Sequence, residues 1–270
     1  MYILLAVDGT YSATNYNVGT NRSFVRRFFD RFSGGYKAFF EGPASAAGFD
    51  VDNIIRGADR EIRRAIRHGA SEPDLKICLV GHSRGGHIVT DIAMRLNRLR
   101  LSDIVPSVTR PSQQPATRTR LIAHDPLSAP LLHAQMAQSL SSANESEPTL
   151  RVHFMGLYDS VDMTWNGADT MTIPPNFDWY AHAMRDPALG SRSSWGNTSN
   201  DILCSVRHRT RFFAGTHGAL GGAPPEHCSD EWAVIADQCT RQLSARENET
   251  AGRRAHDFIL DHARAAQVPI

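Results

Sequence analysis

The chain has 270 residues, of which 41% are hydrophobic, so it can bury a sizeable core as one large domain or two small ones. Its 29 lysines and arginines nearly balance its 28 aspartates and glutamates, which gives a formal net charge of +1. A chain so close to neutral presents no strong field for a nucleic acid or an anionic membrane surface. We therefore expect no nucleic-acid partner.

The N-terminal residues lack the features of a signal peptide. Their apolar run, Tyr2 to Val7, is short and no basic residue precedes it. No stretch approaches the roughly 18 to 20 apolar residues that a membrane-spanning helix needs. A cytoplasmic protein is the simplest expectation, and export by a route that needs no cleaved signal stays open.

The four cysteines contain no C-x-x-C pair, so neither a zinc ribbon nor a thioredoxin-type site is predicted. Cys78 lies in an apolar run and is expected to be a buried thiol. The sequence does not exclude a disulfide bridge between Cys228 and Cys239.

Apolar runs alternate with segments of helical periodicity along the first hundred residues. The pattern predicts strands over 2–7, 36–40 and 75–80, and helices over 21–32, 52–68 and from Gly85 to about 99. Strands that alternate with helices are typical of a parallel sheet covered on both faces. We therefore predict an α/β fold with a mostly parallel central sheet and helices on both faces.

The second half of the chain is less regular. It predicts strands over 121–123, 152–157 and 211–214, and helices over 230–243 and 251–266. We expect one domain over 1–270, with insertions at about 102–148 and 164–205. The second insertion is expected to leave the sheet, and its aromatic residues suit a lid or an ordinary core equally: Trp165, Phe177, Trp179, Tyr180 and Trp195.

The sequence G-H-S-R-G, at Gly81 to Gly85, lies between a predicted strand and a predicted helix. This is the setting of a nucleophile elbow, in which a strained turn presents a serine hydroxyl at the top of a sheet. Ser83 is therefore the candidate nucleophile, and the N–H of Arg84 is the first candidate oxyanion donor. The alternatives are a glycine-rich turn with an idle serine, or a phosphate loop, which the absence of its lysine disfavours.

A serine needs a base, and on such a fold the order along the chain is serine, acid, histidine. His217 is the best-placed base because it follows a predicted strand inside A-G-T-H-G-A-L-G-G. His82 and His87 are too close to Ser83 in sequence to be the base and are expected to pack or to line the site. Three other histidines have polar neighbours in the sequence and are expected at the surface: His208, His227 and His256.

Two aspartates end strand-like runs and are candidates for the acid that orients the imidazole. Asp159 follows the longer run and is favoured, and Asp125 is the alternative. The loop after the first strand, Asp8-Gly9-Thr10, reaches the same edge of a parallel sheet. Its backbone N–H groups, at Gly9, Thr10 or Tyr11, are candidates for the second oxyanion donor, and Asp8 is expected to hold the loop.

These stretches carry a resemblance. The chain resembles the α/β-hydrolases, and it is similar to a bacterial family that includes the family-1 lipase effectors of type VI secretion and many uncharacterised relatives. The matching segments, in order, are D-G-T (Asp8 to Thr10), G-H-S-R-G-G (Gly81 to Gly86), G-L-Y-D-S-V (Gly156 to Val161) and F-F-A-G-T-H-G-A-L-G-G (Phe212 to Gly222). Relatives commonly carry phenylalanine where this chain has His82.

The resemblance implies a triad of Ser83, Asp159 and His217 that cleaves carboxylic esters without a metal or an organic cofactor. In the effector branch it implies a phospholipid substrate, transient contact with a membrane surface, and a secretion or immunity protein as partner. The chain departs from the larger effectors, because it is short and its 102–148 segment has no clear counterpart.

Overall fold

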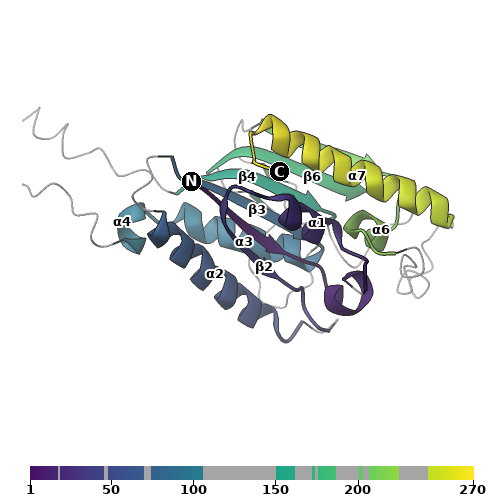
Figure 1. Cartoon of the computed structure of the whole chain (residues 1–270), viewed down its shortest axis with the longest axis horizontal. Coiled ribbons are helices and arrows are strands. Elements are labelled where there is room, and N and C mark those ends of the chain that lie inside the picture. The colour runs from purple at the N-terminus through teal and green to yellow at the C-terminus, as the bar shows by residue number, and fades with distance from the viewer. Residues whose placement is uncertain are drawn as a thin grey trace, which may run out of the picture.

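The computed structural model describes residues 1–17, 19–45, 48–69, 74–105, 150–161, 172–173, 176–186, 201–202, 207–224 and 243–270. Its centre is a six-stranded sheet in the order β2-β1-β3-β4-β6-β8, and all neighbouring strands are parallel (Figure 1). The strands are β1 (Tyr2–Val7), β2 (Gly35–Phe40), β3 (Lys76–His82), β4 (Val152–Tyr158), β6 (Phe177–Arg185) and β8 (Arg207–Phe213). A separate short pair joins β5 (Thr172–Ile173) to β7 (Asp201–Ile202).

Helices cover both faces of the sheet (Figure 1). One face carries α2 (Val51–His68), α3 (Arg84–Asn97) and α4 (Leu101–Ile104). The opposite face carries α1 (Phe24–Arg31), α6 (His217–Gly221) and α7 (Ala245–Ala265). The predicted α/β class, with a parallel sheet between two helical layers, is confirmed.

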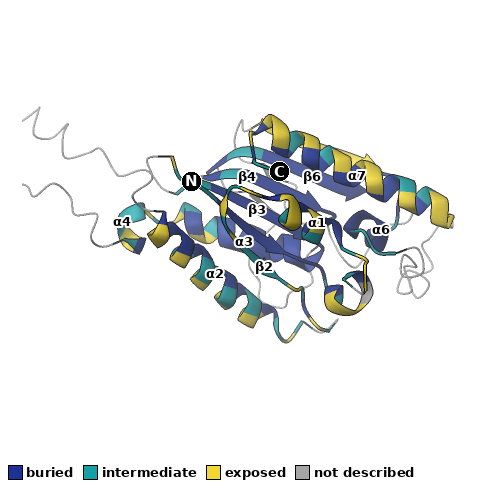
Figure 2. Ribbon diagram, viewed as in Figure 1, coloured by how far each residue is buried: buried dark blue, intermediate teal, exposed yellow. Residues whose placement is uncertain are grey.

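The core consists of two apolar layers, one on each face of the sheet. Along β1, Leu5 and Val7 pack toward α2 and α3, whereas Leu4 and Ala6 pack toward α1 and α7. Figure 2 shows the inner strands β3 and β4 buried, while α2 and α7 expose their outer faces. The edge strand β8 is exposed from Arg207 to Phe212. Burial on both faces explains why β1, β3 and β4 have near-continuous apolar sequences.

Strand β6 corrects the prediction that the 164–205 segment leaves the sheet. Residues Phe177–Arg185 form a strand between β4 and β8, and Phe177 and Tyr180 are buried in the core. These two side chains, with the partly buried Trp179, are therefore core residues and not parts of a lid. Trp165 and Trp195 lie outside the described residues, as does the 102–148 insertion beyond residue 105.

The other predicted elements are present where the structure describes them, with shifted ends; β8 begins four residues before the strand expected over 211–214. The helix expected from Gly85 begins one residue earlier, and α7 begins at Ala245, six residues before the expected start. Cys78 is buried, as predicted. The expected strand over 121–123, the helix over 230–243 and the Cys228–Cys239 pair lie outside the described residues. Within the described part of the chain, no helix has the length and apolarity to cross a membrane.

The strand order reverses between β1 and β3. The chain passes from β1 to its neighbour β2 on one side, and the later strands follow from β3 on the other side. In open α/β sheets, ligands bind at the carboxyl ends of the strands at such a reversal. Asp8 and Gly9 follow β1 and Ser83 follows β3, so the fold brings both predicted loops to this point.

Candidate active site

Ser83 occupies a strained turn between β3 and α3. Its backbone has φ 55° and ψ −128°, a region that residues other than glycine rarely adopt and that costs about 1 to 3 kcal/mol. Its N–H donates to the Tyr158 carbonyl at 3.0 Å, which ties the turn to the end of β4. The residue is 6% exposed. The predicted elbow geometry is thus present, with α3 beginning at the next residue.

The glycines on either side of Ser83 have no room for a side chain. A Cβ atom added to Gly85 would lie 2.2 Å from the Val7 carbonyl oxygen, and one added to Gly81 would lie 2.6 Å from the Gly85 carbonyl oxygen. Both obstacles are backbone atoms, which cannot rotate away. The two glycines therefore allow α3 to pack directly against the ends of β1 and β3.

We expect Gly85→Ala to lower the free energy of unfolding by about 3 kcal/mol, because the added methyl group must push β1 and α3 apart. Urea unfolding followed by circular dichroism measures the change. Gly57→Ala in α2 is the control, since its added Cβ meets only the rotatable Phe40 ring at 3.0 Å and an alanine favours the helix. Equal stability of Gly85→Ala and the wild type would contradict the close packing.

Ser83, His217 and Asp159 form a continuous hydrogen-bonded chain. The Ser83 Oγ and His217 Nε2 atoms are 2.8 Å apart, and His217 Nδ1 is 2.7 Å from Asp159 Oδ2. His217 is 5% exposed and Asp159 is fully buried. Because the carboxylate accepts from Nδ1–H, Nε2 is left as the acceptor for the Ser83 hydroxyl, which is the tautomer that a general base requires.

Asp159 is held as a carboxylate despite its burial. Burial acts to raise the pKa of Asp159, but the hydrogen bond and charge of His217 and the nearby Arg185 outweigh it, so this pKa lies well below its usual range. The backbone N–H of Arg185 donates to Oδ1 at 2.9 Å. The carboxylate therefore has one oxygen fixed by β6 and the other aimed at the imidazole.

A second histidine supports the turn that carries Asp159. The backbone of Asp159 has a positive φ of 40°, and the next N–H, that of Ser160, donates to His182 Nε2 at 3.1 Å. Since Nε2 accepts, Nδ1 carries the proton and lies 3.1 Å from the Tyr180 hydroxyl. Burial lowers the pKa of His182 to about 4, although Asp159 acts to raise it, so the ring stays neutral. It acts as a fixed acceptor for the turn.

His217 begins the short helix α6, and two side chains hold it there. The Thr216 N–H donates to Asn248 Oδ1 on α7 at 2.9 Å. The buried His82 ring lies against the His217 ring with centroids 4.9 Å apart, and its Nε2 is 3.3 Å from the His217 carbonyl oxygen. His82 therefore packs at the site, as expected of it. His87 is also buried.

The loop after β1 is organised by Asp8, as predicted. Its fully buried carboxylate accepts hydrogen bonds from the Gly9 N–H at 2.8 Å, from Asn17 Nδ2 at 3.1 Å and from the Ser23 hydroxyl. Burial raises the pKa of Asp8 to about 6, and the three hydrogen bonds offset part of that effect. Asp8 thus joins Gly9, Asn17 and Ser23 to the end of β1.

The raised pKa of Asp8 predicts that the Asp8 carboxylate lowers the free energy of unfolding by an amount that depends on pH. Between the unfolded pKa near 3.8 and the folded pKa near 6, the native state binds more protons, so the Asp8 contribution to stability falls as pH rises. We expect Asp8→Asn to remove that cost, so that its stability relative to the wild type improves by about 2 to 3 kcal/mol from pH 4 to pH 7. Urea unfolding of both proteins across this range measures the difference. A difference that does not change with pH would contradict the raised pKa.

The candidate oxyanion donors are not equivalent. The Gly9 N–H donates to Asp8 and the Tyr11 N–H donates to the Pro43 carbonyl at 2.9 Å, so both N–H groups already have an acceptor within the protein. Thr10 is the remaining candidate in this loop. The loop adjoins the elbow, because a Cβ added to Gly9 would lie 3.1 Å from the Ser83 Cβ. The Arg84 N–H lies at the N-terminus of α3, and its buried side chain donates to the Ser45 carbonyl at 2.9 Å.

Two further predictions have different outcomes. Asp125, the alternative acid, lies outside the described residues, as does His227. His208 is exposed, as expected, but His256 is buried, which corrects its placement at the surface. Its ring stacks on Phe24 with centroids 4.6 Å apart, and its Nδ1 lies 2.8 Å from the Tyr158 hydroxyl. It faces inward because it lies one turn after Gly252, on the buried face of α7.

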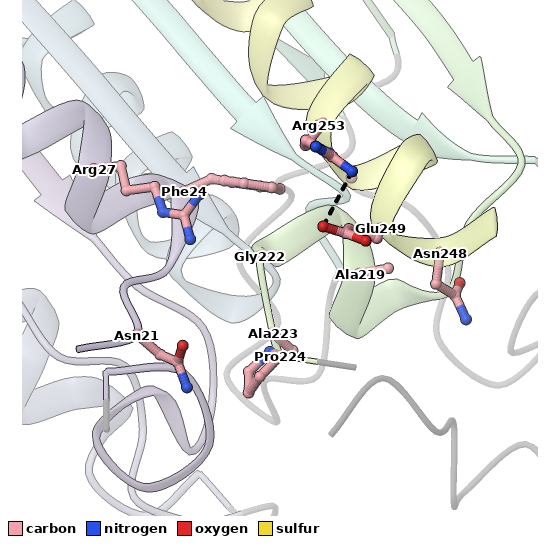
Figure 3. A pocket seen from close by; sticks show the side chains of 11 residues that line it. Asn21, Phe24, Arg27, Ala219, Gly222, Ala223, Pro224, Asn248, Glu249 and Arg253 are labelled. Carbon is pink, nitrogen blue, oxygen red and sulfur yellow. Dashed lines mark ion pairs between the residues drawn. The ribbon is translucent and has the colours of Figure 1, made fainter. Parts of the chain in front are cut away.

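A cavity of about 230 Å³ lies near the site, between the start of α1, α6 and α7 (Figure 3). Phe24 and Ala219 line it together with Arg27, and Arg253 forms an ion pair with Glu249 at 3.0 Å on α7. Ser83, Asp159 and His217 are not among its lining residues. Among the described residues, no group of three or more His, Cys, Asp or Glu side chains is placed to hold a metal ion.

Comparison with known proteins gives a limited likeness. No protein-family model matches the sequence, and no curated protein matches it. An uncharacterised protein from Pseudomonas aeruginosa has a similar structure, with a TM-score of 0.50 and 12% identity over the whole of this chain and 46% of that one. The Tle1 effector bound to the VgrG spike of the type 6 secretion system gives a TM-score of 0.40 and 14% identity, over 82% of this chain and 50% of that one. The chain spans about half the length of each, and the first likeness supports the fold alone.

Proposed function

We propose that the protein is a serine hydrolase that cleaves carboxylic esters through an acyl-enzyme, with a lipid ester as the substrate. The observation that carries the proposal is the hydrogen-bonded chain from Asp159 through His217 to Ser83, with contacts of 2.7 and 2.8 Å. The strained turn at Ser83 is a second support, because such strain is retained where function needs it.

The proposed reaction follows from the direction of these hydrogen bonds. Ser83 Oγ attacks the ester carbonyl while His217 Nε2 takes its proton, and Asp159 stabilises the imidazolium that forms. The N–H groups of Arg84 and Thr10 are the proposed donors to the oxyanion. The imidazolium then returns the proton to the leaving alcohol, and a water molecule activated by His217 hydrolyses the acyl-enzyme. No metal or organic cofactor takes part in the proposed reaction.

The lipase or phospholipase assignment rests on the sequence resemblance to the type VI secretion lipase effectors. The same resemblance supports export through such a system, contact with a membrane surface, and a secretion or immunity protein as partner. The substrate experiment compares hydrolysis of a soluble short-chain ester with that of phospholipid vesicles. Cleavage of both is expected of a phospholipase, and cleavage of the soluble ester alone would restrict the protein to esterase activity.

Two alternatives keep the fold and change the function. An acyltransferase would pass the acyl group to an alcohol, so a competing alcohol in the assay would yield a new ester instead of free acid. A binding protein on a hydrolase fold would hydrolyse no ester and would not react with a fluorophosphonate. The hydrogen bond to the Ser83 hydroxyl favours a catalytic role over this second alternative, because it is the contact that activates a serine.

A further inference from the structure

Arg185, at the end of β6, is a buried charged residue beside the triad. Its side chain is 2% exposed, and its Nε atom lies 3.9 Å from Asp159 Oδ2, the oxygen that contacts His217. Its backbone N–H donates to the other oxygen, Oδ1, at 2.9 Å. One residue therefore contacts the carboxylate through its backbone and approaches it with its charge.

The guanidinium of Arg185 does not behave as a structural arginine usually does. A buried guanidinium normally uses its five N–H donors in hydrogen bonds, because an unpaired buried charge is costly. In the described part of the chain, the Nε, Nη1 and Nη2 atoms of Arg185 are all buried without a hydrogen-bond partner. What remains is the attraction between this cation and the Asp159 carboxylate, in a site where little water screens it.

We propose that Arg185 is a positioning residue: its guanidinium keeps Asp159 ionised and aimed at His217, and it sets the pH range in which His217 acts as a base. The inference rests on the proposed function, because it assigns Arg185 a role in the same triad. The charge acts on both partners in the same sense. It favours the carboxylate form of Asp159, and it opposes the accumulation of a second positive charge on His217.

Other titratable and charged groups at the site are contributed by five elements: His182 on β6, His82 on β3, His217 on α6, Arg84 on α3 and Asp8 after β1. His182 stays neutral because burial lowers its pKa to about 4, and it contacts Ser160 and Tyr180. Asp8 Oδ1 lies 4.0 Å from His82 Nδ1, and Asp8 belongs to the loop after β1. Among the ion pairs within the described residues, Asp159 has two partners, His217 and Arg185.

Removal of the Arg185 charge should therefore shift the acid limb of the pH–rate profile to higher pH. Without Arg185, both Asp159 and His217 are protonated more easily, and a protonated His217 cannot take the Ser83 proton. We expect the midpoint of the acid limb to rise by about one pH unit when a neutral residue replaces Arg185. A lysine keeps the charge, so Arg185→Lys should leave the midpoint within a few tenths of a unit of the wild-type value.

The test is the second-order rate of Ser83 labelling by a fluorophosphonate between pH 4.5 and 9, in the wild type, Arg185→Met, Arg185→Gln and Arg185→Lys. Labelling needs no knowledge of the natural ester. Circular dichroism melting identifies the variants that fold. An upward shift in either folded neutral variant, with Arg185→Lys unshifted, supports the proposal.

Three outcomes separate the possible failures. A wild type that is never labelled rejects the proposed function, and this inference with it. If the wild type is labelled and the neutral variants have the same midpoint of the acid limb, the role of Arg185 is overturned. The proposed function is then unaffected. If neither neutral variant folds, Arg185 is required for folding, and the proposal is rejected.

Discussion

Ser83→Ala is expected to reduce ester hydrolysis by at least about 10⁴-fold, to the level of the uncatalysed reaction plus what binding alone supplies. The hydroxyl is the atom that His217 Nε2 contacts at 2.8 Å, and no other group in the proposed reaction can form the acyl-enzyme. Initial rates on a soluble aryl ester, measured with both proteins at equal concentration, give the ratio.

A neighbouring serine provides the control for this experiment. Ser45 lies near the elbow, and the contact it makes with Arg84 uses its backbone carbonyl, which Ser45→Ala retains. We expect Ser45→Ala to keep wild-type activity within about twofold, as for most substitutions of a partly exposed residue. If Ser83→Ala hydrolysed the ester as fast as Ser45→Ala, Ser83 would not be the nucleophile.

Asp159→Asn is the substitution with the second large expected effect, a fall in kcat of about 10³- to 10⁴-fold. An asparagine can present its NH₂ group to His217 Nδ1, which favours the tautomer with the proton on Nε2. That tautomer cannot accept the Ser83 proton. The substitution also leaves the buried Arg185 guanidinium, 3.9 Å away, without its carboxylate, so a loss of stability is expected as well.

Asp125→Asn is the matched comparison, because Asp125 is the other aspartate that ends a strand-like run in the sequence. We expect its kcat to stay within about twofold of the wild type, since the described site already supplies His217 with a carboxylate at 2.7 Å. Rates on the aryl ester, with melting temperatures to account for stability, measure both effects. A large fall in Asp125→Asn with an unchanged Asp159→Asn would transfer the role of the acid to Asp125.

Ser83, Asp159 and His217 could be proposed as a triad from the sequence because each has a local signal. Ser83 has glycines at fixed positions around it, Asp159 follows an apolar strand, and His217 lies among small residues after a strand. On a parallel sheet, residues that follow strands meet at one edge, so strand order did not have to be known in advance. The structure places these three side chains in contact.

The supporting residues had no such signal. Arg185 and His182 lie on β6, whose sequence F-D-W-Y-A-H-A-M-R mixes polar and apolar residues without a period. The segment is a strand because its neighbours β4 and β8 pair with it, and this pairing is long-range information. A buried histidine that accepts from a backbone N–H looks in sequence like any surface histidine. His256 is likewise buried although its sequence context is polar, and its Nδ1 contacts the Tyr158 hydroxyl.

The sequence also could not show which backbone N–H group of the loop after β1 is available as an oxyanion donor. Gly9, Thr10 and Tyr11 are consecutive, and each carries an N–H that a loop could direct at Ser83. Only the hydrogen bonds of the folded loop separate them, since the Gly9 N–H donates to Asp8 and the Tyr11 N–H donates to the Pro43 carbonyl. A residue's identity says little about the direction of its backbone N–H.

The most direct test of Ser83 as the nucleophile is the site of fluorophosphonate attachment in the wild-type protein, located by digestion and mass spectrometry. We predict one adduct, on Ser83, that is absent from Ser83→Ala and forms far more slowly in Asp159→Asn. A folded wild type that gives no adduct, or an adduct on another residue, would contradict the proposed nucleophile.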